Sequence, residues 1–258
     1  MELAAGRGSA AGALLAAGGC VSELARAAVE LEQAGAEDIL RWTYSRFRRV
    51  AIVASFQAES TVLIDIAAQL VERPEVVTLD TGRLPQETHD QINRELASHR
   101  VRLHVQAPDP DEINALAAEH GANPFYRSAE LRRLCCDVRK SRPLARALEG
   151  YDAWVTGLRR DQGVTRAATP VVAEDHAHGG IAKVAPLVGW SEEHVWDYIR
   201  SRGLRYHELY DRGYRSIGCA PCTRAVREGE DARAGRWWWE QGEVKECGLH
   251  WAPSVAVP

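Results

Sequence analysis

The chain has 258 residues, of which 45% are hydrophobic and 26% are charged. This composition excludes a disordered or fibrous chain and provides apolar residues for one substantial core or two small ones. The formal net charge is −4, so nucleic acid is not an expected partner, and an anion would need a local basic cluster. Six cysteines are too few for a disulfide scaffold.

The first 20 residues are rich in Ala and Gly and predict a flexible amino-terminal arm, residues 1–20. A signal peptide is not expected, because Glu2 stands where such peptides are basic and Arg7 is the only basic side chain before Cys20. No run of about 18 uncharged apolar residues is present, so no membrane span is expected. These features indicate a cytoplasmic protein.

Predicted helices and strands alternate along the middle of the chain. Helical periodicity covers residues 21–47 in two pieces, and further helices are expected over residues 61–72, 85–98, 111–120 and 191–202. Strands are expected over residues 49–55, 75–79, 101–106, 151–157 and 181–188. The alternation predicts an α/β fold: one domain over residues 21–226 with a mostly parallel twisted sheet flanked by helices.

Residues 227–258 are rich in charge, Gly and Trp and are predicted to be a mobile carboxy-terminal tail. The run of tryptophans at 237–239 cannot face one core, so we expect a helix that docks through one Trp face. His176 and His178 fall in a polar segment that we expect to be a solvated loop and not a metal site.

The loop after the first predicted strand is a candidate phosphate site, because ligands of open parallel sheets bind beyond the carboxyl ends of the strands. Ser55 and Ser60 bring hydroxyl groups to this loop, and the helix that follows offers backbone N–H groups and a positive dipole end. Serines before helices are also common caps, so the loop alone leaves both interpretations open.

Four of the six cysteines form two close pairs. Cys135 is followed directly by Cys136, and Cys219-Ala-Pro-Cys222 forms the second pair. Four thiolates can hold zinc or an iron–sulfur cluster. Adjacent cysteines chelate one small ion poorly, so this spacing favours a cluster, with zinc or structural thiols as the alternatives.

Lys140 follows Cys136 by about one helical turn if this segment is a helix. Its ammonium group could then face both the thiolates and an anionic substrate. The alternative is a solvated basic face, because several arginines surround it in the sequence.

Several motifs together resemble a known family, the sulfonucleotide reductases of the adenine-nucleotide α-hydrolase-like superfamily. The loop Ser55-Phe56-Gln57-Ala58-Glu59-Ser60 is similar to the superfamily's pyrophosphate loop but lacks its glycines, which argues against ATP cleavage. Two further motifs resemble signatures of the sulfonucleotide reductases as a whole: Leu79-Asp80-Thr81-Gly82-Arg83 and Glu246-Cys247-Gly248-Leu249-His250. The two cysteine pairs resemble the paired motif of one branch, the assimilatory adenylyl-sulfate reductases. The resemblance covers residues 36–250, so Cys20 lies outside it and is expected to be a structural or incidental thiol.

The resemblance implies reduction of adenosine 5′-phosphosulfate (APS) to sulfite and AMP, with Cys247 as the nucleophile. An S-sulfocysteine forms on Cys247, and thioredoxin or a glutaredoxin-like reductant then releases sulfite. Reduction of 3′-phosphoadenylyl sulfate (PAPS) is the main alternative. An ATP-using thiolation enzyme and an iron–sulfur redox sensor are further alternatives, and a homo-oligomer is left open.

The site residues that follow fall into two sets. The resemblance implies a [4Fe–4S] cluster on Cys135, Cys136, Cys219 and Cys222. The residues expected to bind the sulfonucleotide are Ser55, Ser60, Asp80, Thr81, Lys140, Gly157, Leu158, Arg166, Arg233, Arg236 and His250. Each of the three arginines could instead be a solvated surface residue.

Overall fold

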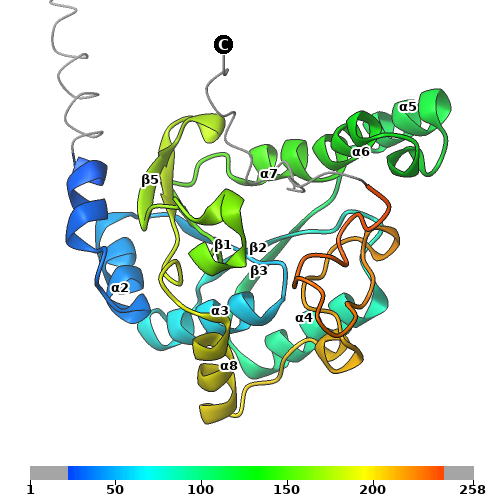
Figure 1. Cartoon of the computed structure of the whole chain (residues 1–258). Helices are drawn as coiled ribbons and strands as arrows, with labels where there is room; N and C mark the ends of the chain where they lie inside the picture. Colours follow the sequence, from blue (N-terminus) through cyan, green and yellow to red (C-terminus); the bar gives the residue numbers. More distant parts are fainter. Residues whose placement is uncertain (1–22, 241–258) are drawn as a thin grey trace, which may run out of the picture.

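A six-stranded sheet in the order β3-β2-β1-β4-β6-β5 forms the centre of the computed structural model, which describes residues 23–240 (Figure 1). The parallel strands are β1 (Val50–Val53), β2 (Glu75–Leu79), β3 (Arg102–Gln106), β4 (Ala153–Val155) and β6 (Ile181–Val184). The remaining strand, β5 (Val172–Asp175), pairs antiparallel with β6. The predicted α/β fold with a mostly parallel sheet is confirmed.

Helices cover both faces of this sheet (Figure 1). One face carries the helix of residues 23–30, α2 (Ala36–Arg46), α3 (Ala58–Leu70), α4 (Gln86–Ser98) and α8 (Glu192–Ser201). The other face carries α5 (Pro110–His120), α6 (Ala129–Cys136) and α7 (Arg142–Ala147). The larger apolar core lies between the sheet and the first group, and a smaller core lies under α7.

The middle strands are short, apolar and buried, as expected when helices cover both faces. All three residues of β4 are buried, and Ile52 of β1 is fully buried. Strand β3 at one edge is instead mostly exposed. The best-buried part of the sheet therefore lies around β1 and β4.

Two sequence expectations, about the start of a helix and about a polar segment, are wrong. Helix α3 begins at Ala58, three residues earlier than predicted, so Glu59 and Ser60 belong to its first turn. The polar segment that contains His176 and His178 is not simply a solvated loop, because it begins within β5, and His178 Nδ1 lies 2.7 Å from Asp175 Oδ2. Charged residues in β5 conceal its strand pattern.

The tryptophan run also differs from the prediction. Residues 237–239 form turns, not a helix, and Trp237 has a φ of 44°, which no helix accommodates. Trp237 is nevertheless buried, whereas Trp238 is exposed. Residues 227–240 thus pack against the α/β body, although the tail was predicted to be mobile as a whole.

Within residues 23–240, no helix is long and apolar enough to cross a membrane. Cys20 and the predicted amino-terminal arm lie outside the described residues, as do Cys247 and His250.

Candidate functional site

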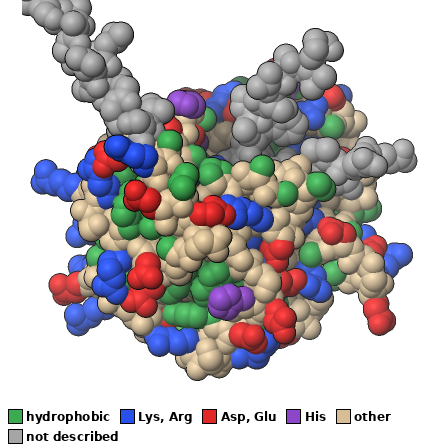
Figure 2. All heavy atoms as spheres, turned by 60° about the vertical axis from the view of Figure 1, so that its left-hand side comes forward, with side chains coloured by type: hydrophobic (Ala, Val, Ile, Leu, Met, Phe, Trp, Pro, Cys, Tyr) green, Lys and Arg blue, Asp and Glu red, His purple; other side chains and the backbone are tan. Residues whose placement is uncertain are grey.

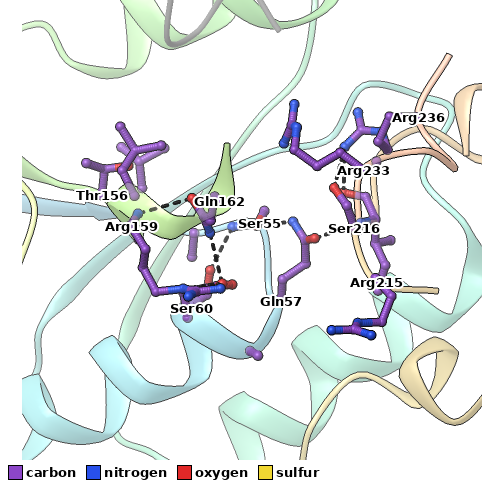
Figure 3. Close-up of a pocket in the computed structure, with 18 of the residues that line it drawn as sticks. Ser55, Gln57, Ser60, Thr156, Arg159, Gln162, Arg215, Ser216, Arg233 and Arg236 are labelled. Carbon is purple, nitrogen blue, oxygen red and sulfur yellow. Dashed lines mark hydrogen bonds and ion pairs between the residues drawn. The ribbon is translucent and has the colours of Figure 1, made fainter. Parts of the chain in front are cut away.

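A cavity of about 250 Å³ lies beyond the carboxyl ends of β1, β2 and β4. The strand order reverses between β1 and β4, since the chain runs outward through β2 and β3 and then returns to β4. Such a reversal is where open α/β sheets bind their ligands. The cavity walls come from the loops after these strands and from residues 215–218 and 231–236 (Figure 3).

The loop after β1 forms one wall with two serines. Phe56 has a φ of 56° and a fully buried ring, so the backbone turns sharply before α3 begins. The Ser55 N–H donates to Ser60 Oγ at 3.1 Å, and Gln57 Nε2 donates to Ser55 Oγ at 2.8 Å. Ser55 and Ser60 both line the cavity, as predicted, and Gln57 lies between them and Ser216 (Figure 3).

The loop after β4 packs tightly against the start of α3. A Cβ on Gly157 would lie 2.7 Å from Glu59 Cβ, so this close approach requires glycine. Glu59 Oε1 accepts hydrogen bonds from Arg159 Nε at 3.0 Å and from Gln162 Nε2 at 2.9 Å. Gln162 Oε1 in turn accepts from Arg166 Nη1. The predicted residues Gly157, Leu158 and Arg166 line the cavity.

The cavity wall is positively charged in an acidic chain. Arg159 is paired with Glu59 and Asp161, and Arg215 is paired with Glu192. Six cationic side chains line the cavity against four carboxylates, which favours an anionic ligand. The cations are Lys140, Arg159, Arg166, Arg215, Arg233 and Arg236.

Arg236 is buried against backbone. Its Nη1 donates to Ser216 Oγ and to the Ile217 carbonyl, each at 3.3 Å, and its guanidinium lies 4.7 Å from the Trp237 ring centre. A Cβ on Gly218 would overlap this guanidinium. Arg236 Nε is buried and has no hydrogen-bond partner among the described residues. The groups that hold the guanidinium are neutral, so its positive charge is available to bind an anionic ligand.

The four paired cysteines surround a second, smaller cavity. Cys135 and Cys136 end α6. Cys219 precedes a short 3₁₀ turn and Cys222 ends it, and all four are buried free thiols. Thr81 Oγ1 lies 3.3 Å from Cys219 Sγ. Burial raises the pKa of Cys222 to about 12, so iron ligation there would have to displace a proton.

The wall of the thiol cavity has features that fit an anionic cluster. Among residues 23–240, no three His, Cys, Asp or Glu side chains are arranged to hold one metal ion. The cavity wall also contains Arg83 and Arg139, whose buried Nε groups have no hydrogen-bond partner in the described chain. Sulfur ligands of a [4Fe–4S] cluster accept hydrogen bonds and carry negative charge. The donor set therefore fits the cluster that the resemblance implies.

Lys140 lines both cavities. The segment Asp137–Ser141 forms a π-helical turn between α6 and α7, where the prediction assumed an α-helical turn. Such turns are rare and often occur at functional sites. Lys140 therefore lies between the four thiols and the candidate ligand site.

Some residues lie elsewhere than the sequence indicated. Asp80 is not on the cavity wall; its Oδ1 accepts a hydrogen bond from the Gly82 N–H at 2.9 Å and closes the turn after β2. Tyr210 and Arg215 line the cavity but were not predicted. They come from the irregular stretch after α8, where no periodicity indicates which side chains approach the sheet. The Tyr210 hydroxyl accepts the Ala58 N–H at 3.2 Å.

Comparisons with known proteins agree with this geometry. Residues 49–225 match the phosphoadenosine phosphosulfate reductase domain. Adenosine 5′-phosphosulfate reductase from Allochromatium vinosum is 46% identical over 218 residues, 84% of this chain and 85% of the relative. The enzyme of the same name from Burkholderia cepacia is 44% identical over 213 residues, 83% of this chain and 85% of the relative.

A solved structure shares the fold. Phosphoadenylyl-sulfate reductase from Candida auris, crystallised as a phosphate complex, is 26% identical with a TM-score of 0.67 and covers 79% of this chain and 96% of its own. The sequence match, the shared fold and the cationic cavity beyond the sheet lead to one conclusion: the chain belongs to the phosphoadenosine phosphosulfate reductase family.

Proposed function

We propose that this chain reduces adenosine 5′-phosphosulfate to sulfite and AMP in sulfate assimilation. The observation that carries the proposal is the cationic cavity at the switch point of the sheet, which shares Lys140 with the four-thiol cavity. Relatives at 44% and 46% identity carry the name of this activity. Because the four described cysteines form no disulfide, which is typical of a reducing compartment, we also propose the cytoplasm as its location.

The proposed reaction uses Cys247 as the nucleophile. Its thiolate attacks the sulfuryl sulfur, the bond from sulfur to the bridging oxygen breaks, and AMP leaves with that bonding pair. An S-sulfocysteine results. A thiolate of reduced thioredoxin then attacks the Cys247 sulfur and releases sulfite, and its second thiol resolves the mixed disulfide. Thioredoxin supplies both electrons and ends as a disulfide.

The described residues would hold and orient the substrate. Arg233, Arg236 and Arg166 would bind phosphate and sulfate oxygens, and Ser55 and Ser60 would donate hydroxyl hydrogen bonds. Cys135, Cys136, Cys219 and Cys222 would hold the [4Fe–4S] cluster, which when bound places polarising charge beside Lys140. Lys140 would then bind the sulfonucleotide on the side that faces the cluster.

Sulfite release tests this function. We expect the protein to release sulfite from APS in the presence of reduced thioredoxin, and we expect Cys247→Ser to abolish release while AMP binding stays unchanged. Cys20→Ser serves as the matched control, because Cys20 lies outside the motifs and should not affect turnover. A Cys247→Ser variant as active as the unmodified protein would exclude the mechanism.

Iron analysis tests the cluster separately. We expect four irons per chain and a brown absorbance near about 400 nm. Cys136→Ser should lose both, because one of the four thiol ligands is removed. A colourless protein with one zinc per chain would contradict the cluster.

PAPS remains the second candidate substrate, because the solved neighbour at 26% identity is named a phosphoadenylyl-sulfate reductase. Comparison of kcat/KM for APS and PAPS under the same conditions decides between them. We expect the APS value to be the higher.

A further inference from the structure

We propose that Gln57 is a positioning residue that ties the loop after β1 to the segment that holds Arg236. Its amide makes two hydrogen bonds in opposite directions: Nε2 donates to Ser55 Oγ at 2.8 Å, and Oε1 accepts the Ile217 N–H at 2.7 Å (Figure 3). Gln57 and Ile217 are far apart in the sequence and meet on the wall of the cavity. The inference rests on the proposed function only for the identity of the ligand.

The Ile217 backbone fixes which way the amide of Gln57 faces. An N–H group can only donate, so it must meet the amide oxygen, and the amide nitrogen is then turned toward Ser55. Ser55 Oγ accepts this N–H, which leaves its own hydroxyl proton to donate to another acceptor. Because Ser55 lines the cavity, Gln57 orients the Ser55 hydroxyl as a donor for a ligand oxygen.

Ile217 is held from both sides. Gln57 accepts its N–H, and Arg236 Nη1 donates to its carbonyl at 3.3 Å. Arg236 also donates to Ser216 Oγ. The position of its guanidinium therefore depends on the position of residues 216–217. Gln57 therefore acts on Arg236 through Ile217, and on a ligand through both Ser55 and Arg236.

The backbone before Gln57 is strained in a way that supports this role. Phe56 adopts a φ of 56°, which is unusual for a residue other than glycine, and its ring is buried. This conformation brings Gln57 across toward Ile217. Strain at a binding site persists where surrounding contacts fix it, and the two hydrogen bonds of Gln57 are such contacts.

Hydrogen exchange tests the structural part of the proposal without any ligand. Gln57→Met keeps the length of the side chain and removes both hydrogen bonds, so exchange of the Ile217 amide should accelerate about tenfold or more. Gln57→Glu keeps an acceptor for Ile217 and should retain protection. Gln86→Met is the matched control, because the Gln86 side chain donates to Asp90 within α4 and lies outside the cavity wall.

AMP affinity, measured by titration calorimetry, tests the positioning part. Gln57→Met should weaken AMP binding, by no more than about thirtyfold, because the two neutral hydrogen bonds that are lost lie within the protein and set the upper limit of the effect. Gln57→Met combined with Arg236→Ala should weaken binding less than the product of the single effects, since both residues act through Ile217. Gln57→Glu should protect Ile217 and still bind AMP poorly, because its carboxylate draws the Ser55 proton away from the ligand.

Two results would overturn the proposal: unchanged exchange at Ile217 in Gln57→Met, or single effects on AMP affinity that multiply in the double variant. Failure of the proposed function looks different. In that case the unmodified protein releases no sulfite from APS, and Ile217 exchange still reports whether Gln57 holds the segment.

Discussion

Because Gly218 has no side chain, the Arg236 guanidinium can lie close to its backbone. The Arg236 guanidinium lies close to Gly218, where a Cβ would overlap it, and 4.7 Å from the Trp237 ring centre. Arg236 is 6% exposed and reaches the cavity between these neighbours. The glycine is therefore required by close approach and not by its backbone angles.

Gly218→Ala should displace Arg236 and weaken AMP binding about tenfold or more. The overlapping atoms are the end of a flexible side chain, so we expect the guanidinium to shift and the stability to change little. Titration with AMP and urea unfolding measure the two effects. Gly189→Ala is the control, since nothing lies within 4 Å of a Cβ built there. Equal AMP affinity in both variants would mean that Arg236 does not bind the phosphate.

Helices α3, α4 and α8 are joined by a buried ionic cluster around His99. Its Nδ1 lies 3.1 Å from Glu95 Oε2, and its Nε2 lies 3.3 Å from Asp65 Oδ1, so both ring nitrogens face carboxylates. Tyr198 and Arg202 donate to the other Asp65 oxygen. Hydrogen bonds to Asp65 and then Glu95 raise the pKa of His99 to about 9.

His99→Gln should destabilise the protein in a pH-dependent way. A histidine whose pKa is raised from 6.5 to about 9 contributes its full stability below pH 6.5, loses it as pH rises, and contributes nothing above about pH 9. The difference in unfolding free energy should reach about 3 kcal/mol at pH 6 and vanish near pH 9.5. Urea unfolding across this range measures it. A difference that stays constant with pH would show that His99 acts as a neutral side chain.

A matched control is available on the surface. His176 is 82% exposed at the side chain, so His176→Gln should leave unfolding unchanged across the same range. A similar pH trend in both variants would assign the effect to histidine content and not to the cluster.

The elements that the sequence predicted best are those with a local signal, such as a run of apolar residues or a capping residue. The apolar runs of β1 and β2 and the cap Ser191 of α8 each have a local cause, and the structure places them as expected. The π-helical turn at Asp137–Ser141 has no such local signal, because it differs from an α-helix only in its hydrogen bonds. The sequence alone therefore does not predict this turn.

The residues of the candidate site also fall into those that the sequence could predict and those that it could not. Ser55, Ser60 and Gly157 follow strand ends, and the ends of parallel strands meet at one edge, so their convergence could be predicted. Gln57 and Arg215 reach the cavity through long-range contacts with an irregular segment and with α8. Tertiary packing decides such contacts, and no period or spacing encodes them.

Charge acts differently on the scale of the whole molecule and of the cavity. The chain has a formal charge of −4, and acidic and basic side chains are interspersed over the face shown in Figure 2. At a distance this net charge repels an anion, while inside the cavity six cations face four carboxylates. At about 0.1 M salt the Debye length is about 10 Å, so an entering ligand experiences mainly the local charge.

The sign of the salt dependence separates these two effects. If the cavity cations bind the phosphate, raising the salt concentration from about 0.05 to 0.5 M should weaken AMP binding by about tenfold, because screening reduces the local attraction. If the net charge governed binding, the same change would strengthen it, because screening would reduce the repulsion. Adenosine has no phosphate and should bind equally at both salt concentrations. Calorimetric titration of both ligands measures this, and AMP binding that improves with salt would place the phosphate away from the arginines.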